Sequence, residues 1–474
     1  MIIKENPDEI ISYLEDSSNF RNGKADKVFI PESEEEIVEI LNYSSRKRIP
    51  VTVSGAGTGT VAGRIPEGGF VISMEKFDKI KAIEPERKKA ILQAGVIINR
   101  FLSEIEKFNL FYPPFPTERN AFIGGNISTN ASGEYSFKFG PTRKYIKKIR
   151  MVLTSGKIVE IERGKSFEKD GKIFIDGMEI PLPSYRTPPV KCTAGYYSKE
   201  GMDSIDLIIG SEGTLGVITE AEVNLIDALP QRFIIVIFFP DDKKILNLVR
   251  MIKKRKDLNV FSLEYFDNNS LEFLKKDFPG IPQNSFALYI EAESGIDKME
   301  EWGKIAEEFG AIDVWVGEDE KNYQRLIDFR HRLPENINSY FKSIKSVKVS
   351  VDVAVPEEGF QVLYNFYREI MEKENLHMVL FGHIGENHLH FNMFPEDENE
   401  RLKAYRIYEE CIKKGLSLGG TVSAEHGIGK LKHRWLKMMY GEKGIREMAE
   451  IKKIFDPFCI IGLNNIFPKD ILFI

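Results

Sequence analysis

The chain is poor in cysteine and has no long run of apolar residues. Its 474 residues include only three cysteines, Cys192, Cys411 and Cys459, which are too scattered for a disulfide framework or a CxxC metal site. The longest apolar stretch, residues 233–239 (FIIVIFF), has the length of a buried strand and is too short to span a membrane. The first residues are polar and lack the apolar core of a signal peptide. We therefore expect a cytoplasmic protein, with peripheral contact at the inner face of the membrane as an alternative.

Charges of the two signs are nearly balanced. The chain has 66 Lys and Arg against 72 Asp and Glu, a net charge of −6, and 42% of its residues are hydrophobic. This apolar content predicts a folded protein, and the length suggests two or three domain-sized units. Interspersed, mildly acidic charge argues against nucleic acid as a partner.

The pattern of expected elements changes near residue 228. Before it, the sequence predicts a helix over 31–48, strands over 50–54 and 70–74, and a loop over 162–191. After it come strand 232–239, helix 241–254, strand 258–265, strand 286–292, helix 297–308 and strand 312–317. This β-α-β, β-α-β order is typical of a ferredoxin-like sheet with helices on one face. We expect helices over 399–416 and 443–454 in the C-terminal part, and an α+β protein with domains 1–228 and 229–474.

Three glycine-rich segments lie in the first half. Residues 54–60 (SGAGTGT) follow a strand, but they match neither a dinucleotide fingerprint nor a P-loop, so a tight turn and a phosphate cradle both stay open. Residues 113–117 (PPFPT) lead into 123–133 (IGGNISTNASG), and residues 210–219 (GSEGTLGVIT) come later. Small residues at this density suit backbone lying against a flat ring and a pyrophosphate. Each segment alone could be a hairpin, but three in one domain favour a ligand site.

Five of the seven histidines fall between residues 383 and 433. Residues 382–392 (GHIGENHLHFN) predict strand, turn and strand, with His388, His390 and Asn392 on one face. Residues 419–429 (GGTVSAEHGIG) place Glu425 beside His426 in a loop. Imidazoles and a carboxylate can converge on one divalent metal. Spacing alone leaves a metal site, an acid–base site and an ordinary structural role open.

These segments, together with residues 138–143 (KFGPTR), resemble the vanillyl-alcohol oxidase / p-cresol methylhydroxylase (PCMH) superfamily over nearly the whole chain. The match is closest to its D-2-hydroxyacid dehydrogenase branch, which includes the flavoprotein of glycolate oxidase and D-lactate dehydrogenase. The resemblance implies a two-part PCMH-type FAD-binding domain, a ferredoxin-like cap over about 229–415, and a segment over about 416–474 that returns to the flavin.

The resemblance also implies which residues bind FAD. Residues 51–69 contain no His or Cys for covalent attachment, so we expect non-covalent FAD. The pyrophosphate would lie against Ser54, Gly55, Ala56, Gly57, Thr58, Gly59 and Gly63; the flavin side against Pro116, Thr117, Gly124, Gly125, Asn126 and Gly133; the adenosine end against Glu212 and Ile218; and Thr129, Asn130, Gly216 and Asn464 complete the expected set.

The resemblance assigns a divalent metal, zinc or manganese, to His383, His390 and Glu425. The resemblance also implies that His426 is the general base and that Asn392 contacts the substrate. It pairs Arg330 with the substrate carboxylate, and the alternative for Arg330 is a solvated basic helix end. The family's Asp-Gly-Asn is Glu386-Asn387-His388 here, which leaves His388 as a bystander, a ligand or a specificity element. The family's lysine falls at Ser350, with Lys348 as a nearby substitute.

The expected reaction is oxidation of a D-2-hydroxy acid, of the D-lactate or glycolate type, to the 2-oxo acid. Hydride would pass to flavin N5 while His426 takes the proton. The expected electron acceptor is an iron–sulfur partner protein, an electron-transfer flavoprotein, a quinone or oxygen, and a second copy of the chain is a candidate partner. The alternatives are a flavoenzyme like alkylglycerone-phosphate synthase, or a flavoprotein subunit of an electron-transfer complex.

Overall fold

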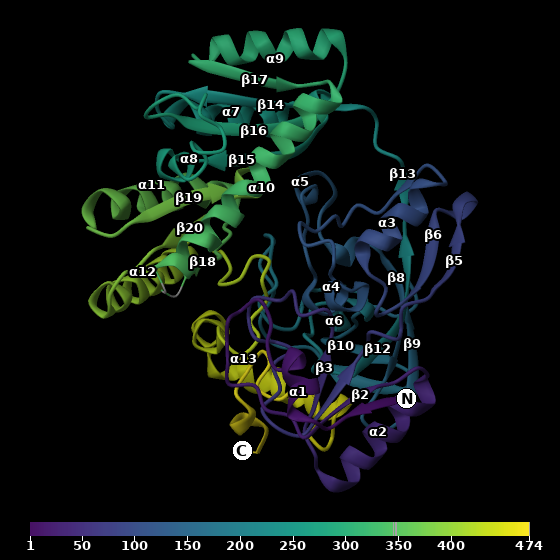
Figure 1. The fold of residues 1–474 in the computed structure, drawn as a ribbon. Coiled ribbons are helices and arrows are strands. Elements are labelled where there is room, and N and C mark those ends of the chain that lie inside the picture. The colour runs from purple at the N-terminus through teal and green to yellow at the C-terminus, as the bar shows by residue number, and fades with distance from the viewer. Residues whose placement is uncertain (345, 347, 474) are drawn as a thin grey trace.

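The computed structural model describes residues 1–344, 346 and 348–473, which form two α+β parts joined near residue 228 (Figure 1). The first part contains a four-stranded sheet in the order β1 (Ile2–Lys4), β2 (Lys27–Ile30), β4 (Phe70–Ser73), β3 (Val51–Ser54). It also contains an antiparallel five-stranded sheet in the order β5 (Ile80–Glu84), β6 (Lys89–Gln93), β12 (Val217–Asn224), β8 (Ile146–Val152), β9 (Ile158–Glu162). The predicted strands over 50–54 and 70–74 are β3 and β4, which pair in parallel.

Helix α2 (Glu34–Lys47) confirms the predicted helix over 31–48. It begins where the Ser33 side chain accepts a hydrogen bond from the Glu36 amide at 3.4 Å, and it ends at Arg48, which has a positive φ of 57°. Acidic residues in its first turn and basic residues in its last turn complement the helix dipole. Its apolar face is buried, so the helix packs on the domain core.

Shorter elements connect the sheets. The region 162–191, predicted as a loop, contains a hairpin of β10 (Lys172–Ile175) and β11 (Met178–Pro181). Strand β7 (Leu110–Phe111) pairs with β13 (Ile226–Asp227) just before the second part begins. The other helices of this part are α1 (Pro7–Ile10), α3 (Ile98–Glu106), α4 (Ile123–Thr129), α5 (Ser136–Phe139) and α6 (Ile205–Ile208).

The second part is built on a seven-stranded antiparallel sheet. Its strand order is β17 (Asp313–Gly317), β14 (Arg232–Phe239), β16 (Phe286–Glu293), β15 (Val260–Phe266), β19 (Met378–Gly382), β20 (His390–Met393), β18 (Val349–Val351). With α7 (Lys243–Lys254) and α9 (Ile296–Glu308), the first four strands form the predicted ferredoxin-like unit, with bounds within two residues of those expected. Strands β19, β20 and β18 extend this sheet and bring the histidine-rich segment to it.

Both faces of this sheet are covered, whereas the sequence predicted helices on one face. Alternate residues of β14 enter two separate apolar cores. The helices α7, α9, α11 (Glu357–Lys373) and α12 (Glu398–Ser417) contribute to one core. On the other face lie α8 (Asn268–Glu272) and the 24-residue α10 (Glu320–Ser343), which the sequence did not predict. Helix α10 carries Arg330, one of the residues predicted to contact substrate.

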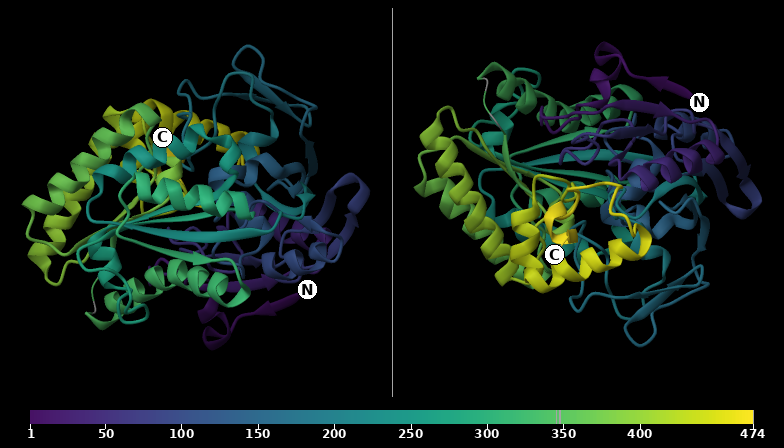
Figure 2. Two further views of the ribbon diagram at one scale, coloured as in Figure 1. Left: turned by 90° about the horizontal axis from the view of Figure 1, so that it is seen from above. Right: turned by 90° about the horizontal axis from the view of Figure 1, so that it is seen from below.

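The C-terminal segment returns to the first part of the chain. Helix α13 (His433–Phe455) contains a kink at Gly441 and leads into residues 456–473. There the Val51 amide donates to the Ile460 carbonyl at 2.7 Å, beside the first glycine loop. The yellow C-terminal segment accordingly lies next to the purple N-terminal elements (Figures 1 and 2). In the described part of the chain, no helix combines the length and apolar character needed to cross a bilayer.

Candidate active site between the glycine loops and the cap

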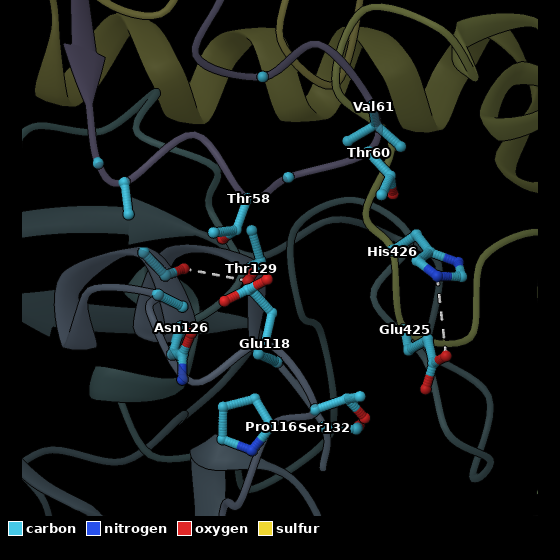
Figure 3. A pocket seen from close by; sticks show the side chains of 18 of the residues that line it. Thr58, Thr60, Val61, Pro116, Glu118, Asn126, Thr129, Ser132, Glu425 and His426 are labelled. Atoms are coloured by element: carbon cyan, nitrogen blue, oxygen red, sulfur yellow. Dashed lines mark hydrogen bonds and ion pairs between the residues drawn. The ribbon is translucent and has the colours of Figure 1, made fainter. Parts of the chain in front are cut away.

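A cavity of about 480 Å³ runs between the glycine segments and the histidine-rich cap strands. Figure 3 shows Thr58, Thr60 and Val61 of the first loop facing Pro116, Asn126 and Thr129, with Glu425 and His426 nearby. The predicted cofactor residues that line the cavity are Gly55, Ala56, Gly57, Thr58, Gly59, Gly63, Pro116, Thr117, Gly124, Gly125, Asn126, Thr129, Gly133, Glu212, Gly216 and Ile218. The three glycine-rich segments therefore meet at one site although they lie far apart in sequence.

The glycines of the cavity wall make room for something other than protein. At Gly59 and Gly125 a Cβ would meet nothing within 4 Å, and at Gly55 and Gly63 it would only touch a neighbour at 4.0 Å. None of these four has a positive φ, so the backbone does not require glycine there. Neither side-chain packing nor backbone geometry explains why these positions are glycine. Close approach of a bound cofactor would explain it, and the lining of this cavity is suitable for FAD.

Three predicted cofactor residues lie outside the cavity lining. Ser54 is buried at the end of β3, and Asn130 accepts a hydrogen bond from the Arg143 amide at 3.0 Å. Asn464 accepts from the Lys469 amide at 2.7 Å. Its neighbour Asn465, which the sequence did not single out, donates to the carbonyls of Gly63 and Glu212 and so ties the C-terminal segment to two glycine loops.

The residue Glu212 joins the third glycine-rich segment to the histidine-rich loop. Its carboxylate accepts the amides of Ile428 and Gly429 at 2.7 and 2.6 Å. Burial raises the pKa of Glu212 to about 7, although these amides oppose the shift. The two motifs that the sequence presented separately are thus held together by one side chain.

His383, His390 and Glu425 converge as predicted for a metal centre. His383 Nε2 lies 3.3 Å from Glu425 Oε2, and His390 Nε2 lies 3.3 Å from Glu425 Oε1. Ligands at about 2.0–2.1 Å from a tetrahedral ion are separated by about 3.4 Å, so these donors have suitable spacing. His383 Nδ1 lies 2.9 Å from the buried Glu264 carboxylate, a contact that fixes the orientation of many metal-binding imidazoles. The donor set fits a divalent ion.

His426 adjoins this trio and is oriented by a buried carboxylate. Its Nδ1 lies 3.0 Å from Asp352 Oδ2, which favours a proton on Nδ1 and leaves Nε2 as the proton acceptor. Burial alone would raise the pKa of Asp352, but His426 and Lys432 hold it well below its usual value. The fully buried His388 lies 3.0 Å from the other oxygen of Asp352 and does not line the cavity, which favours the bystander interpretation.

A second set of possible metal donors consists of Asp352, His388 and His390. Lys432 Nζ lies 2.8 Å from Asp352 Oδ2 and Lys191 Nζ lies 2.7 Å from Glu425 Oε2, so both carboxylates have a cationic partner. The two sets differ in access, because His383, His390 and Glu425 all line the cavity whereas Asp352 and His388 do not. The trio that includes Glu425 is therefore the better candidate for a metal site.

Arg330 lies in the middle of α10, so the alternative of a solvated helix end is wrong. Its guanidinium lies 3.0 Å from Glu134 and 2.8 Å from Glu264, and its side chain is only 10% exposed. Glu264 thus contacts both the arginine and His383. Burial alone would raise the pKa of Glu264, but His383 and Arg330 lower it to about 2.

Arg330 and the trio line the same cavity, whereas Asn392 is fully buried and accepts a hydrogen bond from Ser350 at 2.5 Å. Its predicted contact with substrate stays a prediction. Lys348 lines the cavity with an exposed side chain, although the surrounding protein lowers its pKa to about 8.

The sequence missed four charged residues at this site. Glu134 directly follows the second glycine motif, which is a signal that could have been used. Asp352 lies two residues after Ser350, the position that matches the family's lysine, and was given no role. Glu264 and Lys191 have no motif, because their roles arise from contacts between elements distant in sequence. Lys191 Nζ lies 2.7 Å from Glu425 Oε2 and 3.1 Å from Glu386 Oε2.

Curated relatives match nearly the whole chain. It is 28% identical to D-lactate dehydrogenase of Archaeoglobus fulgidus, with 93% of this chain and 90% of the relative covered. It is 28% identical to the glycolate oxidase protein GlcD of Bacillus subtilis, with 97% and 92% covered. It is 25% identical to D-2-hydroxyglutarate dehydrogenase of Xanthomonas citri, with 93% and 89% covered.

Among solved structures, an alkyldihydroxyacetonephosphate synthase matches with a TM-score of 0.66 at 15% identity, covering 97% of this chain and 81% of the other. At this identity the likeness shows a shared fold. The family model of the FAD binding domain matches residues 25–162, and the model named FAD linked oxidases, C-terminal domain, matches residues 230–462. The chain therefore belongs to the FAD-linked oxidases and is a flavoprotein oxidoreductase with a PCMH-type FAD-binding domain.

Proposed function

We propose that this protein oxidises a D-2-hydroxy acid to the corresponding 2-oxo acid, with FAD bound non-covalently in the glycine-lined cavity. The observation that carries the proposal is the placement of a carboxylate-oriented histidine, His426, beside the donors His383, His390 and Glu425 at one end of that cavity. A base, a metal-type donor set and cationic side chains at one flavin site fit a substrate with adjacent hydroxyl and carboxylate groups. Relatives named for D-lactate, glycolate and D-2-hydroxyglutarate support this substrate class.

When bound, FAD would supply the hydride acceptor, and a divalent ion held by His383, His390 and Glu425 would supply Lewis-acid polarisation of the hydroxyl group. Residues of this chain would accept the proton and orient the substrate. Asp352 holds His426 through Nδ1, so that Nε2 takes the proton of the α-hydroxyl. Arg330, itself fixed by Glu134 and Glu264, orients the substrate carboxylate.

The charges around the cavity favour a substrate with one carboxylate. Arg330 already contacts two buried carboxylates, whereas the described residues include no ion-pair partner for Lys348. With a pKa of about 8, Lys348 carries its charge over most of the population at neutral pH. Arg64 also lines the cavity and has no ion-pair partner in the part of the chain that the structure describes, but it contacts the Gly55 carbonyl in the first glycine loop, away from the histidine-rich strands. Lys348, as the unpaired cation beside those strands, suits a monocarboxylate such as D-lactate or glycolate better than a dicarboxylate. The electrons would leave to an external acceptor: an iron–sulfur partner protein, an electron-transfer flavoprotein, a quinone or oxygen.

The test is anaerobic mixing of the FAD-loaded protein with D-lactate, L-lactate, glycolate and D-2-hydroxyglutarate. We expect D-lactate or glycolate to bleach the flavin absorbance and L-lactate to leave it unchanged. No bleaching by any of these acids would contradict the proposal, and it is the result expected of a non-oxidising synthase or a passive electron-transfer subunit. Bleaching by D-2-hydroxyglutarate in preference to the monocarboxylates would contradict the assignment based on Lys348.

A further inference from the structure

A buried lysine from the FAD-binding part of the chain contacts the donor set in the cap. Lys191 lies in the segment between β11 and α6, and its side chain is only 4% exposed. Its ammonium lies 2.7 Å from Glu425 Oε2 and 3.1 Å from Glu386 Oε2. A buried lysine needs such partners because an uncompensated ammonium is costly in a protein interior. The contact therefore joins the two parts of the chain at the site of the chemistry.

The partner Glu386 belongs to the one stretch of the histidine motif that departs from the family pattern. It ends the short turn Ile384–Glu386, directly after His383, and its carboxylate also accepts a hydrogen bond from Ser136. At Glu386 the family's aspartate is replaced by glutamate, so the negative charge is kept on a side chain one methylene longer, and Lys191 lies between that charge and Glu425.

The ammonium uses an oxygen that also faces the donor set. Glu425 Oε2 is 2.7 Å from Lys191 Nζ and 3.3 Å from His383 Nε2. A divalent ion between the imidazoles and Glu425 would therefore share this carboxylate with a fixed positive charge. Charges of like sign at such short separations repel strongly in a partly desolvated site.

We propose that Lys191 is a built-in counter-ion of the metal site, a positioning residue that holds Glu425 in place without metal and weakens the binding of a divalent cation there. The inference rests on the metal site in the proposed function and adds a consequence: the ion is exchangeable. Glu386 sets the strength of the effect, because it draws the ammonium away from Glu425.

The experiment measures the dissociation constants of Zn²⁺ and Mn²⁺ for the metal-stripped, FAD-loaded full chain, by competition with a chromophoric chelator. Lys191→Met should bind both ions at least tenfold more tightly than the wild type, and Lys191→Arg should keep wild-type affinity. The rise in melting temperature on adding metal should be larger for Lys191→Met as well. A purely structural role predicts the opposite sign, because a collapsed site binds metal more weakly.

Two further variants keep the test decisive. Lys253→Met is the matched control: Lys253 is largely buried in the same region and pairs with Glu357 at 2.6 Å, but it does not touch the donor trio, so its variant should bind metal as the wild type does. Glu386→Gln should weaken metal binding, because the ammonium is then shared with Glu425 alone. That opposite shift tests the inference even where Lys191→Met is unstable.

The outcomes distinguish a failure of the counter-ion role from a failure of the proposed oxidation. Unchanged or weaker metal binding by Lys191→Met, or tighter binding by Glu386→Gln, would overturn the counter-ion role while leaving the proposed oxidation intact. A wild-type protein that binds neither ion would overturn the metal site and this inference together. Flavin bleaching by a D-2-hydroxy acid tests the proposed oxidation by itself.

Discussion

Replacing Asp352 with asparagine tests the proposed orientation of the base. Asp352 is 1% exposed, and its Oδ2 is 3.0 Å from His426 Nδ1. Asparagine keeps the shape of the side chain but removes the charge, and it can present an N–H to Nδ1, which favours the wrong tautomer. A positioned base contributes roughly 10²–10⁴-fold to a proton transfer, equivalent to about 3–5 kcal/mol of barrier. We therefore expect Asp352→Asn to slow flavin reduction by a factor in that range.

The assay is anaerobic stopped-flow reduction of the bound flavin at saturating substrate, with FAD and metal content measured on the same preparation. FAD content should be unchanged, because Asp352 does not line the cavity. Ser423→Ala is the matched control: Ser423 Oγ also donates to Asp352 Oδ2, at 2.8 Å, so its loss removes a neighbour of the carboxylate without touching the His426 contact. A near-wild-type rate in Asp352→Asn, or an equal loss in Ser423→Ala, would show that Asp352 does not orient the base.

Three further predictions address the cofactor, the substrate and stability. Acid or heat should release intact FAD, detected in the supernatant after precipitation; flavin that stays with the denatured chain would contradict non-covalent binding. Glu264→Gln should both raise KM for the hydroxy acid and lower metal occupancy, because Glu264 contacts both Arg330 and His383. Steady-state kinetics and elemental analysis measure the two quantities. A change in only one of them would contradict the coupling of the arginine and the metal site through Glu264. Burial raises the pKa of Asp267 from 3.8 to about 6, so the contribution of Asp267 to the free energy of unfolding should fall by about 3 kcal/mol as the pH rises between those values and stay level above them. Asp267→Asn should lack that fall, so denaturant unfolding should show its stability relative to wild type rising with pH; a constant difference would contradict the shift.

Local sequence patterns were sufficient for much of the fold. The alternation and length of the apolar runs predicted the ferredoxin-like unit, and the pattern over residues 31–48 predicted α2. Helix α10 was missed, although it spans 24 residues, because Pro334 interrupts its pattern and its buried stripe packs against a face expected to be open. No local sequence pattern therefore indicated that helices cover the second face of the seven-stranded sheet.

Some residues of the site could be predicted from the sequence and others could not. Residues within motifs, such as His383, His390 and Glu425, could be found because their spacing reflects a short turn and one loop. The groups that orient them could not, because Glu264 and Lys191 reach the site from other elements of the fold. The glycine loops needed the fold as well, since only the structure shows which missing side chains leave open space.

The central claim is that His426 is the base in the oxidation of a D-2-hydroxy acid. The measurement that tests it most directly is anaerobic flavin reduction by D-lactate or glycolate in His426→Ala, compared with wild type and with His388→Ala. The account predicts that His426→Ala retains FAD and metal but reduces its flavin roughly 10²–10⁴-fold more slowly, while His388→Ala loses much less. Near-normal reduction in His426→Ala, with its cofactor and metal in place, would contradict the account.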